Sequence, residues 1–147
     1  MTAITAAGAI ISLSAAIPGT ETATAYGALS YTVLGEVTDI PAFGKTYNLV
    51  THNPIATRKT NKIKGSYNTG SLTLSLARDP ADAGQVLAQT ALDDDENYSF
   101  EIEFSDGSFQ YFQAKVMSYT TNPASVDSIV ACSIMVEIDT DIVEVAA

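Results

Sequence analysis

A strand and a helix follow one another in the stretch that determines the fold, residues 58–92, which read RKTNKIKGSYNTGSLTLSLARDPADAGQVLAQTAL. Leucine alternates with small residues over 71–77, which predicts a β-strand with one buried face. Asp79 then predicts the N-cap of a helix over 79–92, because aspartate is a preferred capping residue. We expect this helix to end before the acidic run Asp93–Glu96, which is unfavourable at a negative helix C-terminus. Its predicted apolar stripe comprises Ala83, Val86, Leu87 and Ala91.

Alternation of apolar and polar residues predicts several further strands, and their one-sided pattern is typical of antiparallel sheets. The segment Asp106-Gly107 lies between two alternating runs and predicts a hairpin turn. Residues 21–27 are small and threonine-rich, which indicates a loop or an edge. The remaining predicted strands cover 8–14, 31–40, 98–104, 109–119 and 128–139. The predicted fold class is mostly β (α+β): an antiparallel β-sandwich with one flanking α-helix and a long extended loop.

A chain of 147 residues predicts a single domain, 1–147. We expect an N-terminal arm or first strand over 1–27 and a C-terminal tail over 140–147. Residues 43–65 form a long connection that is either an extended loop or a protruding hairpin. Connections of this length are commonly functional.

The charge balance argues against a nucleic-acid-binding protein and favours self-association. There are 17 acidic and 7 basic residues, for a net charge of −10, whereas phosphate binding requires a basic face. Only 16% of residues are charged and 46% are hydrophobic, which predicts an apolar surface covered by another molecule. The basic run Arg58–Lys64 is therefore expected to pair with acidic protein surface.

No pattern indicates an enzyme, a cofactor or a metal. The chain has one histidine, His52, and one cysteine, Cys132, which we expect to be a small buried hydrophobe. A zinc site requires three or four nitrogen or sulfur ligands. Asp93–Glu96 lacks the spacing of an EF-hand, so a solvated acidic loop is favoured over a Ca²⁺ site. Glu101 and Glu103 are read as the polar face of a strand rather than a glycosidase pair. No segment is long enough to span a membrane.

Several segments in order resemble the tail tube (major tail) proteins of long-tailed bacteriophages with flexible, non-contractile tails, the siphovirus type. The segments are GEVTDIP at 35–41, KIKGSYNTGSLTL at 62–74, DAGQ at 82–85 and the hairpin around Asp106-Gly107. The resemblance implies a structural virion protein, assembled in the host bacterial cytoplasm. It implies hexameric rings whose inner strands join into one barrel, and rings that stack into a tube conducting double-stranded DNA. Tape measure, tail terminator and tip proteins are the other implied partners.

Two groups of candidate residues follow from this resemblance. The long loop is expected to reach a neighbouring ring and to be mobile in the free monomer; its contact residues are His52, Arg58, Lys59, Lys62 and Lys64. An acidic lining would let DNA pass without being held. The candidate lumen residues are Glu101 and Glu103, or Glu137 and Asp139.

Two other classes of protein remain open from the sequence. The first is a type VI secretion-like tube protein, whose lumen passes proteins instead of DNA. The second is a non-tubular β-sandwich module, such as a capsid decoration or adhesion protein.

Overall fold

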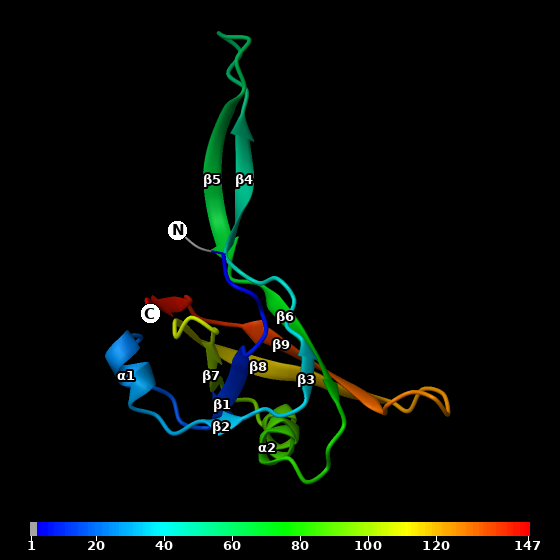
Figure 1. Ribbon diagram of the computed structural model, residues 1–147. Coiled ribbons are helices and arrows are strands. Elements are labelled where there is room, and N and C mark those ends of the chain that lie inside the picture. Colours follow the sequence, from blue (N-terminus) through cyan, green and yellow to red (C-terminus); the bar gives the residue numbers. More distant parts are fainter. Residues whose placement is uncertain (1–2) are drawn as a thin grey trace.

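The body of the molecule is one curled antiparallel sheet, from which a two-stranded hairpin projects (Figure 1). The structure, a computed structural model, describes residues 3–147. Hydrogen bonds connect its strands in the order β2-β1-β7-β8-β9-β6-β3, with β10 added to β8. The strands of the sheet are β1 (Ile10–Ser14), β2 (Thr32–Val33), β3 (Val37–Asp39), β6 (Ser71–Ala77), β7 (Tyr98–Glu103), β8 (Phe109–Asn122), β9 (Ala131–Ile138) and β10 (Val143–Val145). The predicted class, mostly antiparallel β, is confirmed.

The core lies inside the curl of the sheet and is closed by the helix α2 (Ala83–Leu92). Leu72, Leu74 and Leu76 of β6 are at most 1% exposed, as the alternation predicted. The free thiol of Cys132 is also buried, which confirms its expected role as a small hydrophobe. Each fully buried leucine of this kind stabilises the fold by about 1.5–3 kcal/mol.

The long strand β8 holds the curled sheet together, because its two halves pair with different neighbours. Its first half pairs with β7 on one side and β10 on the other. The two halves meet at Ala114, which lies opposite both Tyr98 of β7 and Ile138 of β9. The second half of β8 then continues along β9. The register shifts between Val116 and Ser118, and such bulges bend a strand. The curled sheet is therefore continuous through β8, which joins β7 and β10 at one end to β9 at the other.

The N-cap of α2 lies three residues later than predicted, at Asp82 rather than Asp79. The Asp82 carboxylate accepts the Gln85 backbone N–H at 3.0 Å and also the Gly35 N–H at 3.0 Å. Asp79 instead closes a local turn by accepting the Ala81 N–H. The helix does end at Leu92, as the following acidic residues predicted.

The predicted apolar stripe of α2 is confirmed for Ala91, which is buried, and for Leu87, which packs against the core, but not for Ala83 and Val86, which are exposed. The other buried residues of the helix are Gly84, Gln85 and Ala88. A Cβ atom on Gly84 would collide with the Val33 carbonyl, so the helix lies directly on the backbone of β2. The Gln85 amide is satisfied in this position, since its Nε2 donates to the carbonyls of Ala77 at 2.9 Å and Gly35 at 3.3 Å.

The predicted strand over 31–40 is two short strands, β2 and β3, because the backbone bends between them. Leu34 turns into the core at 4% exposure. Glu36 adopts a φ of 61°, which a continuous strand does not allow. The bend is held by the bond from Gly35 to Asp82, 47 residues away.

A second helix, α1 (Ala23–Gly27), lies where a loop or edge was expected. Thr22 caps it by accepting the Ala25 N–H at 3.2 Å. Tyr26 anchors it on the outer face of the sheet, where the ring is fully buried and stacks on Tyr111 at 5.4 Å. Packing of this one aromatic residue therefore overrides a composition with little helical signal.

The hairpin turn at Asp106-Gly107 is confirmed, with Gly107 at a φ of 88°. The last long strand begins at Ala131 rather than at 128, because a turn closes from Ser125 to Ser128. Three residues of the expected C-terminal tail, 143–145, form β10, which lies opposite residues 109–111 of β8.

Candidate assembly surfaces

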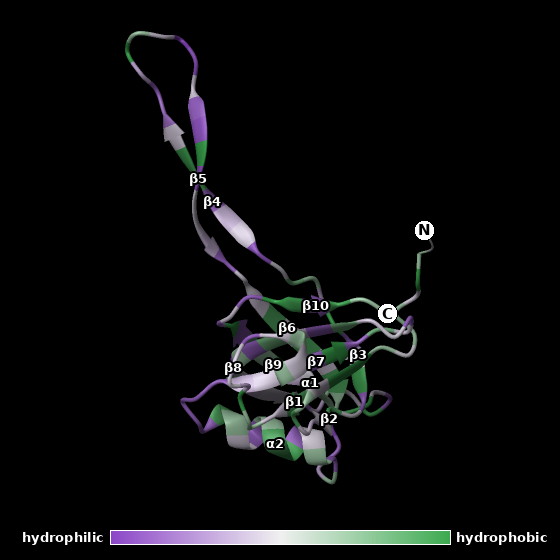
Figure 2. Cartoon of the chain, turned by 90° about the vertical axis from the view of Figure 1, so that its left-hand side faces the viewer, coloured by the Kyte–Doolittle hydropathy of each residue, from purple (hydrophilic) through white to green (hydrophobic). Residues whose placement is uncertain are grey.

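The long connection over 43–65 is a projecting hairpin, formed by β4 (Thr46–His52) and β5 (Asn61–Asn68) (Figures 1 and 2). Of the two predicted forms, the protruding hairpin is therefore the one observed. It ends at Asn68, three residues beyond the predicted boundary at residue 65. Every residue of β4 is exposed. A lone two-stranded hairpin is marginally stable in water, so this element has the geometry of a surface completed by another molecule.

Both faces of the hairpin carry exposed apolar side chains. Leu49 is 65% exposed and Val50 48%, and they point to opposite faces because adjacent strand residues alternate. Ile63 lies opposite Val50 and is 56% exposed. Ile55, in the tip loop, is fully exposed. A contact that covered one face only would leave apolar surface in water.

The hairpin is also the cationic part of an acidic molecule. Its basic residues are Lys45, Arg58, Lys59, Lys62 and Lys64, and residues 43–70 contain no Asp or Glu. The rest of the chain holds all 17 acidic residues and the other two basic residues, Arg78 and Lys115. The formal charges are thus +5 for the hairpin and 2 − 17 = −15 for the body.

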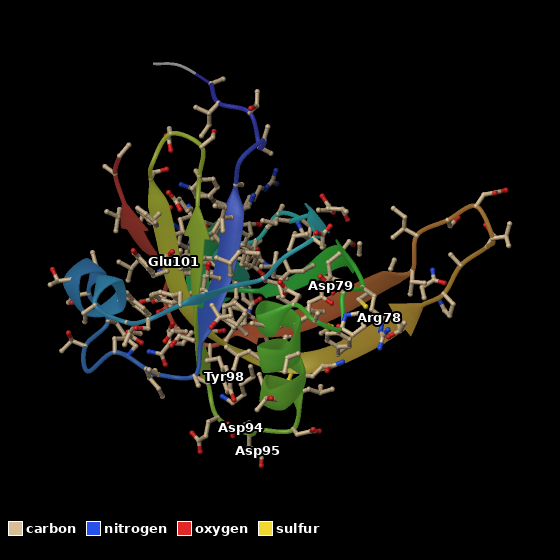
Figure 3. All side chains as sticks on the ribbon, turned by 60° about the horizontal axis from the view of Figure 1, so that its bottom comes forward. Arg78, Asp79, Asp94, Asp95, Tyr98 and Glu101 are labelled. Carbon is tan, nitrogen blue, oxygen red and sulfur yellow. The ribbon has the colours of Figure 1, made fainter. Side chains whose placement is uncertain are left out.

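The sequence-predicted contact residues all lie on this hairpin, in two places. His52, Lys62 and Lys64 belong to its strands, and Arg58 and Lys59 to its tip loop. All five are exposed. The hairpin and α2 lie at opposite ends of the body (Figure 1), and the loop after α2 carries Asp94 and Asp95 (Figure 3). The opposite ends of the molecule therefore carry opposite charge.

A cluster at the base of the hairpin was missed by sequence reasoning. The Tyr67 hydroxyl donates to Asp141 at 3.0 Å, and the Lys45 ammonium lies 3.8 Å from the same carboxylate oxygen. The Lys45 nitrogen is also 4.2 Å from the centroid of the Tyr67 ring, and the Lys64 nitrogen 4.8 Å from that of Tyr47. The hydrogen bond to Asp141 raises the pKa of Tyr67. No local pattern signals contacts across 74 residues.

The four candidate lumen residues do not form one cluster. Glu101 is half-buried on the outer face of β7, opposite Tyr111, and burial raises its pKa. Glu103 follows on the same face. Glu137, on β9, lies opposite Ser71 and Lys115.

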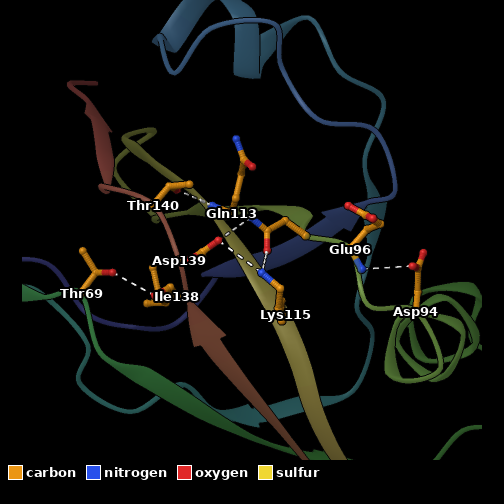
Figure 4. Close-up of polar contacts among 9 residues, drawn as sticks. Thr69, Asp94, Glu96, Gln113, Lys115, Ile138, Asp139 and Thr140 are labelled. Atoms are coloured by element: carbon orange, nitrogen blue, oxygen red, sulfur yellow. Dashed lines mark hydrogen bonds and ion pairs between the residues drawn. The ribbon is translucent and has the colours of Figure 1, made fainter.

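Asp139 is the member of this set that is engaged in a closed polar network (Figure 4). The Lys115 ammonium donates to Asp139 at 3.3 Å and to the side-chain oxygen Oδ1 of Asn97 at 2.6 Å. The Asn97 amide donates to Asp139 at 2.9 Å. The bonds from Asn97 and Lys115 hold the pKa of Asp139 below its usual value. One of the two cations of the body is thus already paired.

The outer face of β6 and β9 is small and polar. Serine and threonine dominate it, and its residues are Ser71, Thr73, Ser75, Ser133, Met135 and Glu137. Ser71 and Thr73 of this face are exposed, and its other four residues are partly exposed, whereas α1 contacts β10. The one acidic side chain among these six residues is Glu137.

The described residues contain no group of three or more His, Cys, Asp or Glu side chains arranged to hold a metal ion. A hollow of about 570 Å³ lies at the base of the hairpin and has a polar lining. No helix among residues 3–147 is both long and apolar enough to cross a membrane.

The chain belongs to the lambda phage tail tube protein family, whose family model matches residues 19–141. It is therefore a structural component of a phage-like tail, and the family is one of tail tube proteins rather than enzymes. This confirms the tail tube resemblance inferred from the sequence. No curated protein sequence matches the chain.

Solved structures share the fold at low sequence identity. A chain of the PVC sheath/tube terminator, from an extracellular contractile injection system, has a TM-score of 0.72 at 12% identity and covers 99% of both chains. The tail of an empty gene transfer agent particle, determined with C6 symmetry, gives 0.66 at 13% identity, covering 93% and 95%. The SPP1 tail tube gives 0.65 at 16% identity, covering 95% of this chain and 77% of that one. Because a contractile system is among them, the non-contractile tail type stays a prediction.

Proposed function

We propose that six copies of the chain form a ring, and that rings stack into a tail tube that conducts double-stranded DNA into the host. One observation carries this proposal: a cationic hairpin, exposed on both faces, projects from the end of an acidic body opposite α2. The hairpin reaches the acidic body of a copy in the neighbouring ring. Burial of Leu49, Val50 and Ile63 in that contact contributes the apolar part of the binding energy.

Joining of sheet edges closes each ring in this proposal. The outer edge of β3 has no strand partner among residues 3–147, and β8 pairs with β7 only as far as Ala114. Pairing of these two edges between copies makes β8, β9, β6 and β3 of each copy part of one barrel. A closed barrel removes the edges that otherwise promote aggregation.

The face turned away from the core then lines the channel. DNA carries one negative charge per about 1.7 Å of duplex axis, so a cationic lining would hold it. The outer face of β6 and β9 offers hydroxyl groups and Glu137, and the nearby Lys115 is paired with Asp139. Six copies carry a formal charge of 6 × −10 = −60. Of the candidate lumen residues, we place Glu137 in the channel, because Glu101 lies opposite Tyr111, on which Tyr26 of α1 stacks.

The remaining proposed partners are those of a tail. A tape measure protein occupies the channel during assembly, and terminator and tip proteins close the two ends. The match to the tail tube protein family supports the proposal that the partners are other tail proteins.

Charge reversal on the hairpin tests the proposal. We expect the triple variant Lys59→Glu, Lys62→Glu, Lys64→Glu to fold normally by circular dichroism but to form no tubes in negative-stain electron microscopy. The matched control is the triple arginine variant at the same positions, which keeps the charge and should form tubes. Normal tubes from the glutamate variant would refute the role of the hairpin.

The images also decide between the classes of protein. Hollow filaments support a tube, and single rings or monomers of the parent protein would favour a non-tubular capsid or adhesion module. A tube whose lumen maps as net positive would contradict the DNA conduit. A type VI secretion-like tube would form filaments as well, and failure of the assembled particles to package DNA would favour it.

A further inference from the structure

The helix α2 presents an outward face that is open to solvent. Its inner side packs on the sheet, whereas Val86 is 48% exposed, Leu92 is 37% exposed, and Gln89 is exposed between them. Val86, Gln89 and Asp93 follow one another at intervals of three and four residues, so they share one side of the helix. The face therefore combines apolar side chains with a carboxylate at its C-terminal end.

Four consecutive acidic residues, Asp93–Glu96, border this face, and all four are exposed. The loop orients the Asp94 carboxylate, which accepts the Tyr98 hydroxyl at 3.3 Å and the Glu96 backbone N–H at 3.1 Å. The two ion pairs of the described chain both lie elsewhere. The four carboxylates therefore repel one another and the negative C-terminal end of the helix, with no cation from residues 3–147 to offset them.

The tip of the projecting hairpin carries the complementary set of side chains. Arg58 and Lys59 lie in the tip loop, and Lys62 follows at the start of β5. None of these three cations has an ion-pair partner within the described chain. Ile55, in the same loop, is fully exposed. Each of the two surfaces thus combines apolar side chains with charges of one sign, and the two signs are opposite.

The two surfaces lie at opposite ends of the molecule, since the hairpin projects from the end of the body opposite α2 (Figure 1). Asp94 and Asp95 lie just beyond the end of that helix (Figure 3). The tip of one hairpin therefore cannot reach α2 of its own chain. Two different complementary surfaces on one chain make a heterologous contact, which propagates from copy to copy.

We propose that the outward face of α2, together with Asp93–Glu96, is the docking site for the hairpin tip of a second copy in the next ring. Arg58, Lys59 and Lys62 of that copy approach the four carboxylates, and its Ile55 lies against the apolar part of the helix face. A mobile hairpin is compatible with this site, because docking orders it. The inference rests on the proposed function and names the surface that receives the hairpin.

Exchange of charge between the two surfaces tests the docking site. The loop variant is Asp95→Lys, Glu96→Lys, and the tip variant is Arg58→Glu, Lys59→Glu. Each should fold normally by circular dichroism but raise the protein concentration needed for tube growth by about tenfold or more, because like charges then meet across the contact. The chain that carries all four substitutions should form tubes near the concentration of the parent, because its charges are exchanged rather than lost.

The matched control for the exchange is the tip variant combined with Glu21→Lys and Asp127→Lys, two exposed acidic residues outside the docking site. This control has the same formal charge as the exchange variant but should not recover tube growth. Normal tubes from the loop variant, or no recovery in the exchange variant, would overturn the docking site while a tip variant without tubes keeps the inter-ring role of the hairpin. Normal tubes from the tip variant would refute that role and the docking site together.

Carbodiimide cross-linking of the unmodified protein gives a second readout. The reagent joins a lysine amine to a carboxylate in direct contact through an amide bond, with loss of water. Mass spectrometry of assembled tubes should show Lys59 or Lys62 joined to a residue of Asp93–Glu96. Dilute monomer should lack this product, because the two surfaces lie at opposite ends of one chain. Tubes in which these lysines are joined only to other acidic residues, or to none, would overturn the docking site.

Discussion

Asp82 accepts a hydrogen bond from the backbone N–H of Gly35 at 3.0 Å, across 47 residues of sequence. The same carboxylate oxygen caps α2 through Gln85. One side chain therefore fixes both the start of the helix and the bend between β2 and β3. This bend sets the position of β3, the strand whose outer edge is free in the described chain.

Asp82→Ala should lower the free energy of unfolding by about 2 kcal/mol, because it removes an N-cap and leaves the Gly35 N–H without its acceptor. Urea unfolding followed by circular dichroism measures the loss. The matched control is Asp79→Ala, whose carboxylate closes only a local turn with Ala81 and should cost less. Equal losses in the two variants would contradict the assignment of Asp82 as the cap.

Gly84→Ala should destabilise the protein although alanine is the better helix former by about 1 kcal/mol. The added Cβ would collide with the Val33 carbonyl, so α2 must move away from β2. Thermal unfolding should show a lower Tm. The control is Gly19→Ala, where no atom lies within 4 Å of the added Cβ. A Tm for Gly84→Ala at or above that of the parent would refute the close approach.

The network of Asp139 predicts a particular pH dependence. Its folded pKa is lowered from the ordinary value of 3.8, chiefly by bonds from Asn97 and Lys115. The stabilisation is therefore full above 3.8 and is lost as the pH falls through the lower, folded-state pKa. Lys115→Gln should be less stable than the parent at neutral pH, and this difference should shrink in strong acid.

Urea titrations at neutral pH and at a pH well below 3.8 measure this effect. The control is Lys59→Gln, an exposed lysine of the tip loop, which should show no such pH-dependent difference. A stability difference for Lys115→Gln that stays constant with pH would mean that Asp139 gains nothing from the lysine.

Substitutions at two leucines, Leu74 and Leu49, should separate effects on folding stability from effects on tube growth. Leu74→Ala should cost about 2–5 kcal/mol of folding stability, because the side chain is fully buried and leaves a cavity. Leu49→Ala should change the stability of the monomer little, since the side chain is 65% exposed. It should nevertheless raise the protein concentration needed for tube growth, measured by light scattering. A large stability loss from Leu49→Ala would place that residue in the folding core.

The elements predicted best were those whose signals are local. Strand β6 was bounded correctly because leucine alternates over its whole length, and the Asp106-Gly107 turn because its geometry requires glycine. The cap of α2 was misplaced because Asp79 and Asp82 have the same local propensity. What separates them is Gly35, which no local pattern connects to the helix.

The surfaces were predicted only in part, for a similar reason. The basic residues of the hairpin were found because charge can be read directly from the sequence. The contact of Tyr67 with Asp141 was missed, because two polar residues 74 positions apart carry no sign that they meet. The small helix α1 was missed because it depends on the burial of Tyr26 against Tyr111.

The absence of any acidic residue from the hairpin has a consequence for the direction of tube growth. In the proposed head-to-tail stacking, the rings leave bare cationic hairpins at one end of the filament and bare acidic bodies at the other. In that arrangement growth has a polarity, and the two ends cannot be closed by the same surface. A protein that stops elongation at the hairpin end must present negative charge, and one that nucleates at the other end must present positive charge.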